Sequence, residues 1–190
     1  GENNPLHAVT LGATAARLAR LVTRPLLVVR RPAGDPYRRI LVATDFSDES
    51  LQALREGMRL ARGAQVVLVH CYDLVYEGRM RLAGVRDEQL QTYRSQGRSQ
   101  AEGQVQGLLA RVEEPERIRV ELRQGDPRFE LPAAVREHGA ELVVVGKHGR
   151  SFLAETLLGS VTTSLLGEAG CDVLVVPGAP GGAAWARKKR

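Results

Sequence analysis

The sequence predicts an α/β fold in which a parallel β-sheet is covered by helices on both faces. Short runs of Val, Leu and Ile recur along the chain, for example at 65–72 and 141–146. Near-continuous apolar runs are typical of strands that are buried on both faces, as in parallel sheets. Segments with the apolar spacing of helices separate these runs, as a parallel sheet with crossover helices requires. The length of 190 residues suits one such domain with a remainder.

The first two predicted strands are "RILVATD" at 39–45 and "QVVLVHCY" at 65–72. A helix connects them, and Ser47 is its predicted N-cap because a serine side chain can accept a hydrogen bond from the first helical turn. One apolar face of this helix is formed by Leu51, Leu54, Met58 and Ala61.

The next part of the chain predicts a long helix and a third strand. An irregular stretch at 73–88 precedes the helix, and the third strand is "RIRVELRQG" at 117–125. The apolar positions of the helix are Ala101, Val105, Leu108 and Val112.

The last part predicts two helices and two strands. Asp126 as N-cap and Pro127 at the first helical position open a helix that ends at Gly139. The fourth and fifth strands are "ELVVVG" at 141–146 and "DVLVVP" at 172–177, with a helix after Gly159 between them.

The N-terminal segment 10–31 reads as a helix followed by a strand, with no strand of its own before it. Shifted by 147 residues, it aligns without gaps on 157–178, and the matched pairs are Leu11 with Leu158, Gly12 with Gly159, Leu18 with Leu165, Leu27 with Leu174, Val28 with Val175 and Val29 with Val176. Chance similarity between two amphipathic units is one explanation. A matching glycine at the predicted helix start favours a duplication of which only the last helix and strand are present.

The chain therefore divides into three predicted parts. Residues 1–34 are the end of an incomplete first repeat, residues 35–178 form a complete domain, and residues 179–190 form a flexible basic tail. Four of the five net positive charges are Arg187, Lys188, Lys189 and Arg190. Because the body of the protein is then nearly neutral, the basic pI does not indicate a specific nucleic-acid partner.

Composition and cysteine usage predict a cytoplasmic globular protein. No apolar stretch approaches the length of a membrane span, and the N-terminus has no basic segment followed by an apolar one. Cys71 and Cys171 lie in or beside strand patterns, which fits two reduced, buried thiols better than a disulfide framework.

The segment 143–166, "VVVGKHGRSFLAETLLGSVTTSLL", contains the clearest functional signal. Gly146 ends a strand, Gly149 follows in the next turn, and Gly159 with Ser160 opens a helix. Backbone N–H groups of such turns and of a helix N-terminus suit a polyphosphate, and Arg150 adds a positive charge. The alternative is that these glycines only shape turns. Neither G-x-x-x-x-G-K-[ST] nor a G-x-G-x-x-G after the first strand is present, which excludes two better-known phosphate motifs.

Together, "ILVATDFSDESLQAL", "VLVH", "GDP", "VVVGKHGRS" and "LLGSVTTSLL…DVLVVP" resemble the universal stress protein family over about residues 37–178. The spaced glycine motif is similar to that of the ATP-binding branch of this family. The resemblance implies a Rossmann-like, five-stranded parallel sheet and dimerisation through the last strand. It also implies ATP, with or without Mg²⁺, held with its triphosphate on the glycine loop, and a tandem-type chain with an incomplete first repeat.

The resemblance also implies which residues bind the nucleotide. Those expected around the phosphates are Gly146, Gly149, Arg150, Gly159, Ser160 and Val161, and those expected to complete the site are Thr44, Asp45, Cys71 and Val145. Asp45 would face the ribose and base, although a helix-capping role is the alternative. The backbone of Cys71 would read the adenine edge, with its thiol buried and structural.

No catalytic or metal-binding residue is assigned. A histidine such as His148 can act as a general base near neutral pH, but a structural role in the loop is the more common outcome. Glu155 fits a surface charge better than a metal ligand. Without a carboxylate cluster, any Mg²⁺ would be held mainly by the phosphates.

The predicted function is that of an ATP-binding stress or signalling module with at most slow hydrolysis. The alternatives are a nucleotide-free dimerisation module and an adenylylating enzyme of a related fold. The apolar strand 26–30 is expected to pair antiparallel with 173–177, within the chain or between copies of a homo-oligomer.

Overall fold

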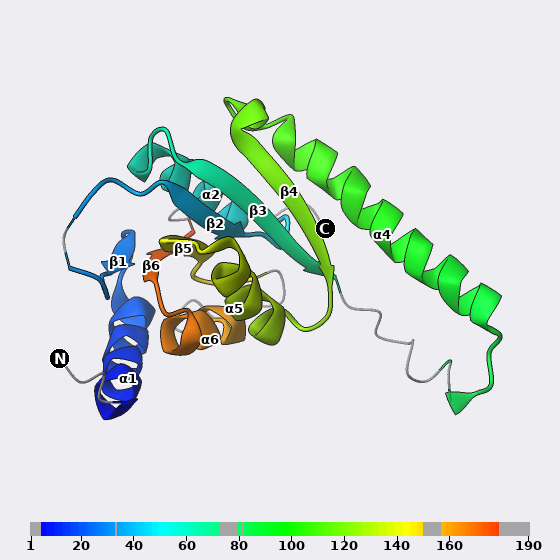
Figure 1. Ribbon diagram of the computed structural model, residues 1–190, viewed down its shortest axis with the longest axis horizontal. Coiled ribbons are helices and arrows are strands. Elements are labelled where there is room, and N and C mark those ends of the chain that lie inside the picture. The colour runs from blue at the N-terminus through cyan, green and yellow to red at the C-terminus, as the bar shows by residue number, and fades with distance from the viewer. Residues whose placement is uncertain (1–4, 33, 73–79, 81, 150–156, 179–190) are drawn as a thin grey trace, which may run out of the picture.

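A computed structural model describes residues 5–32, 34–72, 80, 82–149 and 157–178 (Figure 1). Its centre is a six-stranded sheet in the order β1-β6-β5-β2-β3-β4. The strands are β1 Leu26–Val28, β2 Arg39–Ala43, β3 Gln65–Tyr72, β4 Ile118–Gln124, β5 Leu142–Gly146 and β6 Asp172–Val176. Strands β2 to β6 are mutually parallel, as predicted, and β1 adds a sixth strand antiparallel to β6.

Helices cover both faces of this sheet (Figure 1). The helices are α1 Pro5–Leu21, α2 Asp48–Leu60, α4 Asp87–Leu109, α5 Pro127–His138 and α6 Ser160–Glu168, and a short 3₁₀ turn spans Pro115–Arg117. Apolar side chains of α1, α5 and α6 pack on one face, and those of α2 and α4 pack on the other. The predicted α/β class with two helical layers is therefore confirmed.

The β2 strand shows why the apolar runs lack polar alternation. Leu41 and Ala43 belong to the core under α5 and α6, whereas Ile40 and Val42 belong to the core under α2. All four side chains are buried because both faces of a parallel sheet are covered.

The structure confirms three predicted helix ends, at Ser47, Asp126 and Gly139. The Ser47 side chain accepts a hydrogen bond from the Ser50 N–H, and the Asp126 side chain accepts one from the Arg128 N–H. Gly139 ends α5 in the left-handed conformation with φ 55°. Val112 was expected on the apolar face of the long helix, but it lies beyond the end of α4 and packs on the core from the following turn.

The N-terminal helix and strand form one unit with α6 and β6. Strand β1 pairs with β6 in the same chain, as one of the two predicted arrangements, and α1 packs against α6. The expectation that Gly12 lies at the helix start was wrong, because α1 begins at Pro5. Hydrogen bonds from Thr162 to Gly146 and from Gly159 to Lys147 fix the start of α6 to the end of β5, whereas no strand precedes α1 in the described chain.

Several sequence predictions concern residues outside the described part of the chain. These are Arg150, Glu155, the basic tail 179–190 and, within the irregular stretch 73–88, residues 73–79 and 81. Within the described part, none of the helices combines the length and apolarity needed to cross a membrane.

Candidate functional site

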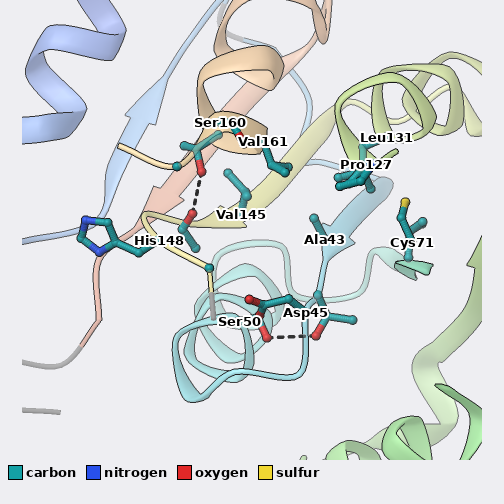
Figure 2. Close-up of a pocket in the computed structure, with 16 residues that line it drawn as sticks. Ala43, Asp45, Ser50, Cys71, Pro127, Leu131, Val145, His148, Ser160 and Val161 are labelled. Atoms are coloured by element: carbon teal, nitrogen blue, oxygen red, sulfur yellow. Dashed lines mark hydrogen bonds between the residues drawn. The ribbon is translucent and has the colours of Figure 1, made fainter. Parts of the chain in front are cut away.

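A cavity of about 150 Å³ opens at the carboxyl edge of the sheet (Figure 2). It is lined by the ends of β2, β3 and β5 and by the first turns of α5 and α6. From β2 the chain builds outward through β3 to β4, and it then returns to place β5 on the other side of β2. In open parallel sheets, ligands bind at this kind of switch point, outside the carboxyl ends of the strands.

The three glycines of the predicted loop meet on one side of this cavity. A Cβ on Gly149 would lie 3.1 Å from Asp45 Oδ2, and one on Gly146 would lie 3.2 Å from the His148 carbonyl oxygen. None of the three glycines has a φ in the left-handed region. The three glycines therefore do not serve an unusual backbone conformation, and Gly146 and Gly149 instead allow neighbouring atoms to approach closely.

The N-terminus of α6 faces the same cavity. Gly159 is the N-cap and has no side chain to bond the first-turn N–H groups, and Ser160 and Val161 line the cavity. Two hydrogen bonds fix this helix start to the end of β5: Thr162 Oγ1 donates to the Gly146 carbonyl at 2.8 Å, and the Gly159 N–H donates to the Lys147 carbonyl at 3.1 Å. The partial positive charge of a helix N-terminus therefore points to the glycine loop.

The turn after β2 supplies the opposite wall. Asp45 Oδ1 accepts hydrogen bonds from the Ser47 N–H at 3.0 Å and the Ser47 hydroxyl at 2.5 Å. Ser47, and not Asp45, is the helix N-cap, so Asp45 orients the capping residue while it also lines the cavity. Buried Thr44 bonds the Ser50 hydroxyl at 2.9 Å and accepts from the Phe46 N–H. Phe46 has φ 63°, a conformation that non-glycine residues rarely adopt outside tight turns.

The remaining wall is apolar, and the sequence analysis expected its residues Cys71, Val145 and Val161 but not the other four. It consists of Ala43, Val69, Cys71, Pro127, Leu131, Val145 and Val161 (Figure 2). The Asp126–Pro127 helix start was recognised as a cap, but its place beside the glycine loop depends on the sheet order. Burial raises the pKa of the Cys71 thiol to about 12, with a further increase from the nearby Glu130 carboxylate.

Nine of the ten residues expected to bind a nucleotide lie along this one cavity: Thr44, Asp45, Cys71, Val145, Gly146, Gly149, Gly159, Ser160 and Val161. Arg150 lies outside the described residues. His148 also lines the cavity, but its ring points away from the other labelled lining side chains in Figure 2. Among described residues, no lysine or arginine lines the cavity. The same part of the chain holds no group of three His, Cys, Asp or Glu side chains arranged for a metal ion.

Fold and site together define a doubly wound α/β protein with a cavity at its switch point. The model of the universal stress protein family matches residues 36–177, and the chain belongs to this family. It is 24% identical over 153 residues to universal stress protein MJ0577 of Methanocaldococcus jannaschii, covering 74% of this chain and 94% of that protein. It is 29% identical over 153 residues to YxiE of Bacillus subtilis, covering 74% and 99%.

Two solved structures have a similar fold. The structure of MJ0577 matches with a TM-score of 0.64 at 24% identity, covering 76% of this chain and 98% of that one. The structure of PA1789 from Pseudomonas aeruginosa matches with a TM-score of 0.59 at 19% identity. This second likeness covers 93% of this chain but 60% of that protein.

Proposed function

We propose that this protein binds ATP in the cavity at the carboxyl edge and acts as a stress-response or signalling module. The observation that carries the proposal is the meeting of two features at the switch point. The Gly146–Gly149 loop and the uncapped start of α6 at Gly159 converge there, without Cβ atoms between their backbones. Such converging N–H groups favour a polyphosphate ligand.

The apolar wall would hold the base. A volume of about 150 Å³ is smaller than the roughly 300–1,000 Å³ of typical small-molecule pockets. Only part of a nucleotide would therefore be enclosed, and the triphosphate would extend over the glycine loop. Asp45, at the cavity wall, would accept hydrogen bonds from ribose hydroxyls.

The phosphates would be bound chiefly by backbone groups, because no lysine or arginine among the described residues lines the cavity. Arg150 and a phosphate-bound Mg²⁺ would add positive charge. Since the His148 ring points away from the other labelled lining side chains (Figure 2), the proposal includes only slow hydrolysis, far below the median enzyme turnover of ~10 per second.

The decisive experiment measures ATP binding by isothermal titration calorimetry in Gly159→Val. A Cβ at Gly159 has ordinary contacts, 3.4 Å to the Lys147 carbonyl oxygen and 3.6 Å to Thr162 Oγ1, so we expect the fold to survive. The bulky side chain would occupy the phosphate position and abolish binding. Gly167→Val is the matched control in the same helix, because a Cβ there meets nothing within 4 Å. Wild-type affinity in Gly159→Val would refute the phosphate site.

The two thiols provide an independent readout of the same site. Cys71 lines the cavity, whereas Cys171 does not, and burial raises the pKa of Cys171 to about 11. We expect ATP to slow alkylation of Cys71 at pH 9 without affecting Cys171. Both cysteines are free, which supports the proposed cytoplasmic location.

The alternatives give different results. A nucleotide-free dimerisation module would purify without bound nucleotide, as judged by mass spectrometry, and would show no protection of Cys71. An adenylylating enzyme would release pyrophosphate and not phosphate on turnover.

We further propose that residues 1–34 correspond to the last helix and strand of a first repeat and that the chain self-associates. The repeat would explain why Leu18 and Val29 are 50% and 53% exposed, whereas their counterparts Leu165 and Val176 are buried. A second copy covering this exposed apolar face is the expected partner. Since β1 occupies the edge of β6 within the chain, the second copy would contact α1 and β1 and not the edge of β6.

A further inference from the structure

Lys147 lies inside the glycine loop but does not line the cavity. It is 5% exposed, and its side chain runs to the N-terminal helix instead. Its Nζ donates hydrogen bonds to the carbonyl oxygens of Arg20 at 2.7 Å and Val22 at 3.1 Å. These contacts join two segments more than 120 residues apart in the sequence.

The two acceptors belong to the C-terminal end of α1. The last carbonyl groups of a helix have no partner within the helix, and the negative end of the helix dipole favours a cation. A buried ammonium in turn requires hydrogen-bond acceptors to offset its loss of water. The contact therefore satisfies both partners, and loss of α1 from its place would leave the Lys147 ammonium without these acceptors.

The backbone of Lys147 is hydrogen-bonded to two further elements, β6 and α6. Its N–H donates to the Val176 carbonyl at the end of β6 at 2.8 Å. Its carbonyl accepts from the N–H of Gly159, the N-cap of α6, at 3.1 Å. One residue thus connects the C-terminus of α1, the end of β6 and the N-terminus of α6.

We propose that Lys147 is a positioning residue through which the docked α1–β1 unit holds the glycine loop in the conformation that binds the nucleotide. This inference rests on the proposed ATP site and assigns the N-terminal unit a part in ligand affinity. Because coupling between two sites is reciprocal, nucleotide in the cavity stabilises the docking of α1 and β1 to the same extent.

The test compares Lys147→Met with Arg20→Met in the full chain. Lys147→Met keeps an apolar stem of similar length and removes the ammonium. Arg20→Met removes a cation from the same helix end but leaves the Arg20 carbonyl and its bond to Lys147 in place. ATP affinity is measured by calorimetry, and docking is measured by hydrogen exchange of the amides in α1 and β1.

We expect Lys147→Met to weaken ATP binding at least about fivefold, the lower end of typical couplings between sites. Amide hydrogen exchange at residues 26–28 should become faster in this variant, and ATP should no longer slow it. Arg20→Met should retain wild-type affinity, and ATP should still protect β1 in that variant.

Wild-type ATP affinity in Lys147→Met overturns the inference. Weaker binding with unchanged exchange at 26–28 also overturns it, because Lys147 would then act directly on the ligand. If Lys147→Met does not fold, Lys147→Gln, which keeps an N–H donor on a shorter side chain, takes its place. ATP affinity and protection of β1 must then change together, and a change in only one of them overturns the inference.

The failure of the proposed ATP site would be separately visible. In that case wild-type protein would bind no nucleotide, and exchange without ligand would still decide whether Lys147 links the loop to α1. If Lys147→Met and Arg20→Met then showed the same amide hydrogen exchange at residues 26–28 and at residues 146–149, the link between the glycine loop and α1 would be refuted.

Discussion

At the scale of single residues, glycines that look alike in the sequence have different roles in the structure. Gly139 adopts the left-handed conformation that ends α5, with φ 55°. Gly149 instead lies so close to Asp45 that a Cβ would be 3.1 Å from the carboxylate oxygen. The first role follows from the local backbone, whereas the second depends on a contact between β2 and the loop after β5.

Asp172 allows a residue-scale prediction about pH. Its buried carboxylate accepts hydrogen bonds from the Arg30 N–H at 2.7 Å, the Arg31 N–H at 3.2 Å and the Tyr37 hydroxyl at 2.8 Å. Burial by itself would raise the pKa of Asp172, but these hydrogen bonds outweigh it and lower the pKa. Burial and the bond to Asp172 raise the pKa of Tyr37 to about 12, so the phenol remains a neutral donor.

Because the folded-state pKa of Asp172 is lowered, its contribution to stability is present above the unfolded pKa of about 3.9 and is lost as the pH falls through the folded value. We expect Asp172→Asn to reduce the free energy of unfolding at pH 7 by about 1.5–3 kcal/mol, as for hydrogen bonds to a charged group. The difference from wild type should shrink below pH 4 in urea unfolding curves. Exposed Asp35, which lies between β1 and β2, is the control, and Asp35→Asn should change the free energy of unfolding little. A pH-independent difference for Asp172→Asn would contradict the assignment.

At the scale of elements, α2 is held against the sheet by an unusually close contact at Gly57. Gly57 is buried, and a Cβ on it would lie 2.9 Å from Val144 Cγ2 on β5. This glycine interrupts the apolar face formed by Leu54 and Met58, and the sequence alone suggests only a weak point in the helix.

We expect Gly57→Ala to destabilise the protein by about 1–3 kcal/mol, since overpacking would push α2 away from β5. Gly107→Ala in α4 is the control, because that site is exposed and a Cβ there meets nothing within 4 Å. It should stabilise the protein by about 0.5–1 kcal/mol through the better helix propensity of alanine. Chemical denaturation followed by circular dichroism measures both, and equal effects of the two substitutions would refute the packing argument.

At the scale of the whole molecule, the register of β1 on β6 has the symmetry of a pair of equivalent strands. Leu27 lies opposite Leu174, its counterpart at the 147-residue shift. Leu26 lies opposite Val175 and Val28 opposite Val173. At the 147-residue shift, Leu26 corresponds to Val173 and Val28 to Val175, so exchanging the two strands converts one of these pairs into the other. Self-complementary pairing of this kind is the mark of a local twofold axis, and it supports the proposed repeat.

Removal of residues 1–34 tests how much the molecule depends on this pairing. The variant starting at Asp35 would expose the full edge of β6, whose five residues are all buried in the intact chain. We expect a lower melting temperature and self-association or aggregation in size-exclusion chromatography with light scattering. The control variant lacks residues 179–190 and retains both β1 and β6. Unchanged stability and oligomeric state in the shortened chain would rule out a structural role for the N-terminal unit.

Local sequence patterns were sufficient to predict which segments are strands and helices, and several of their ends. Apolar runs such as 65–72 and caps such as Ser47 and Asp126 depend on interactions within a few residues, so local patterns are sufficient to predict them. The spacing of Gly146, Gly149 and Gly159 also located one side of the candidate site, because a strand end followed by a helix start fixes which edge of the sheet they share.

Local patterns could not predict what lies opposite those glycines or which element the Lys147 side chain contacts. Pro127 and Leu131 reach the cavity because α5 packs beside α6, and Lys147 turns from the loop to α1 because β1 pairs with β6 in the same chain. Both depend on the order and register of segments far apart in the sequence. The periodicity of one segment records that a face is buried but not which distant segment covers it.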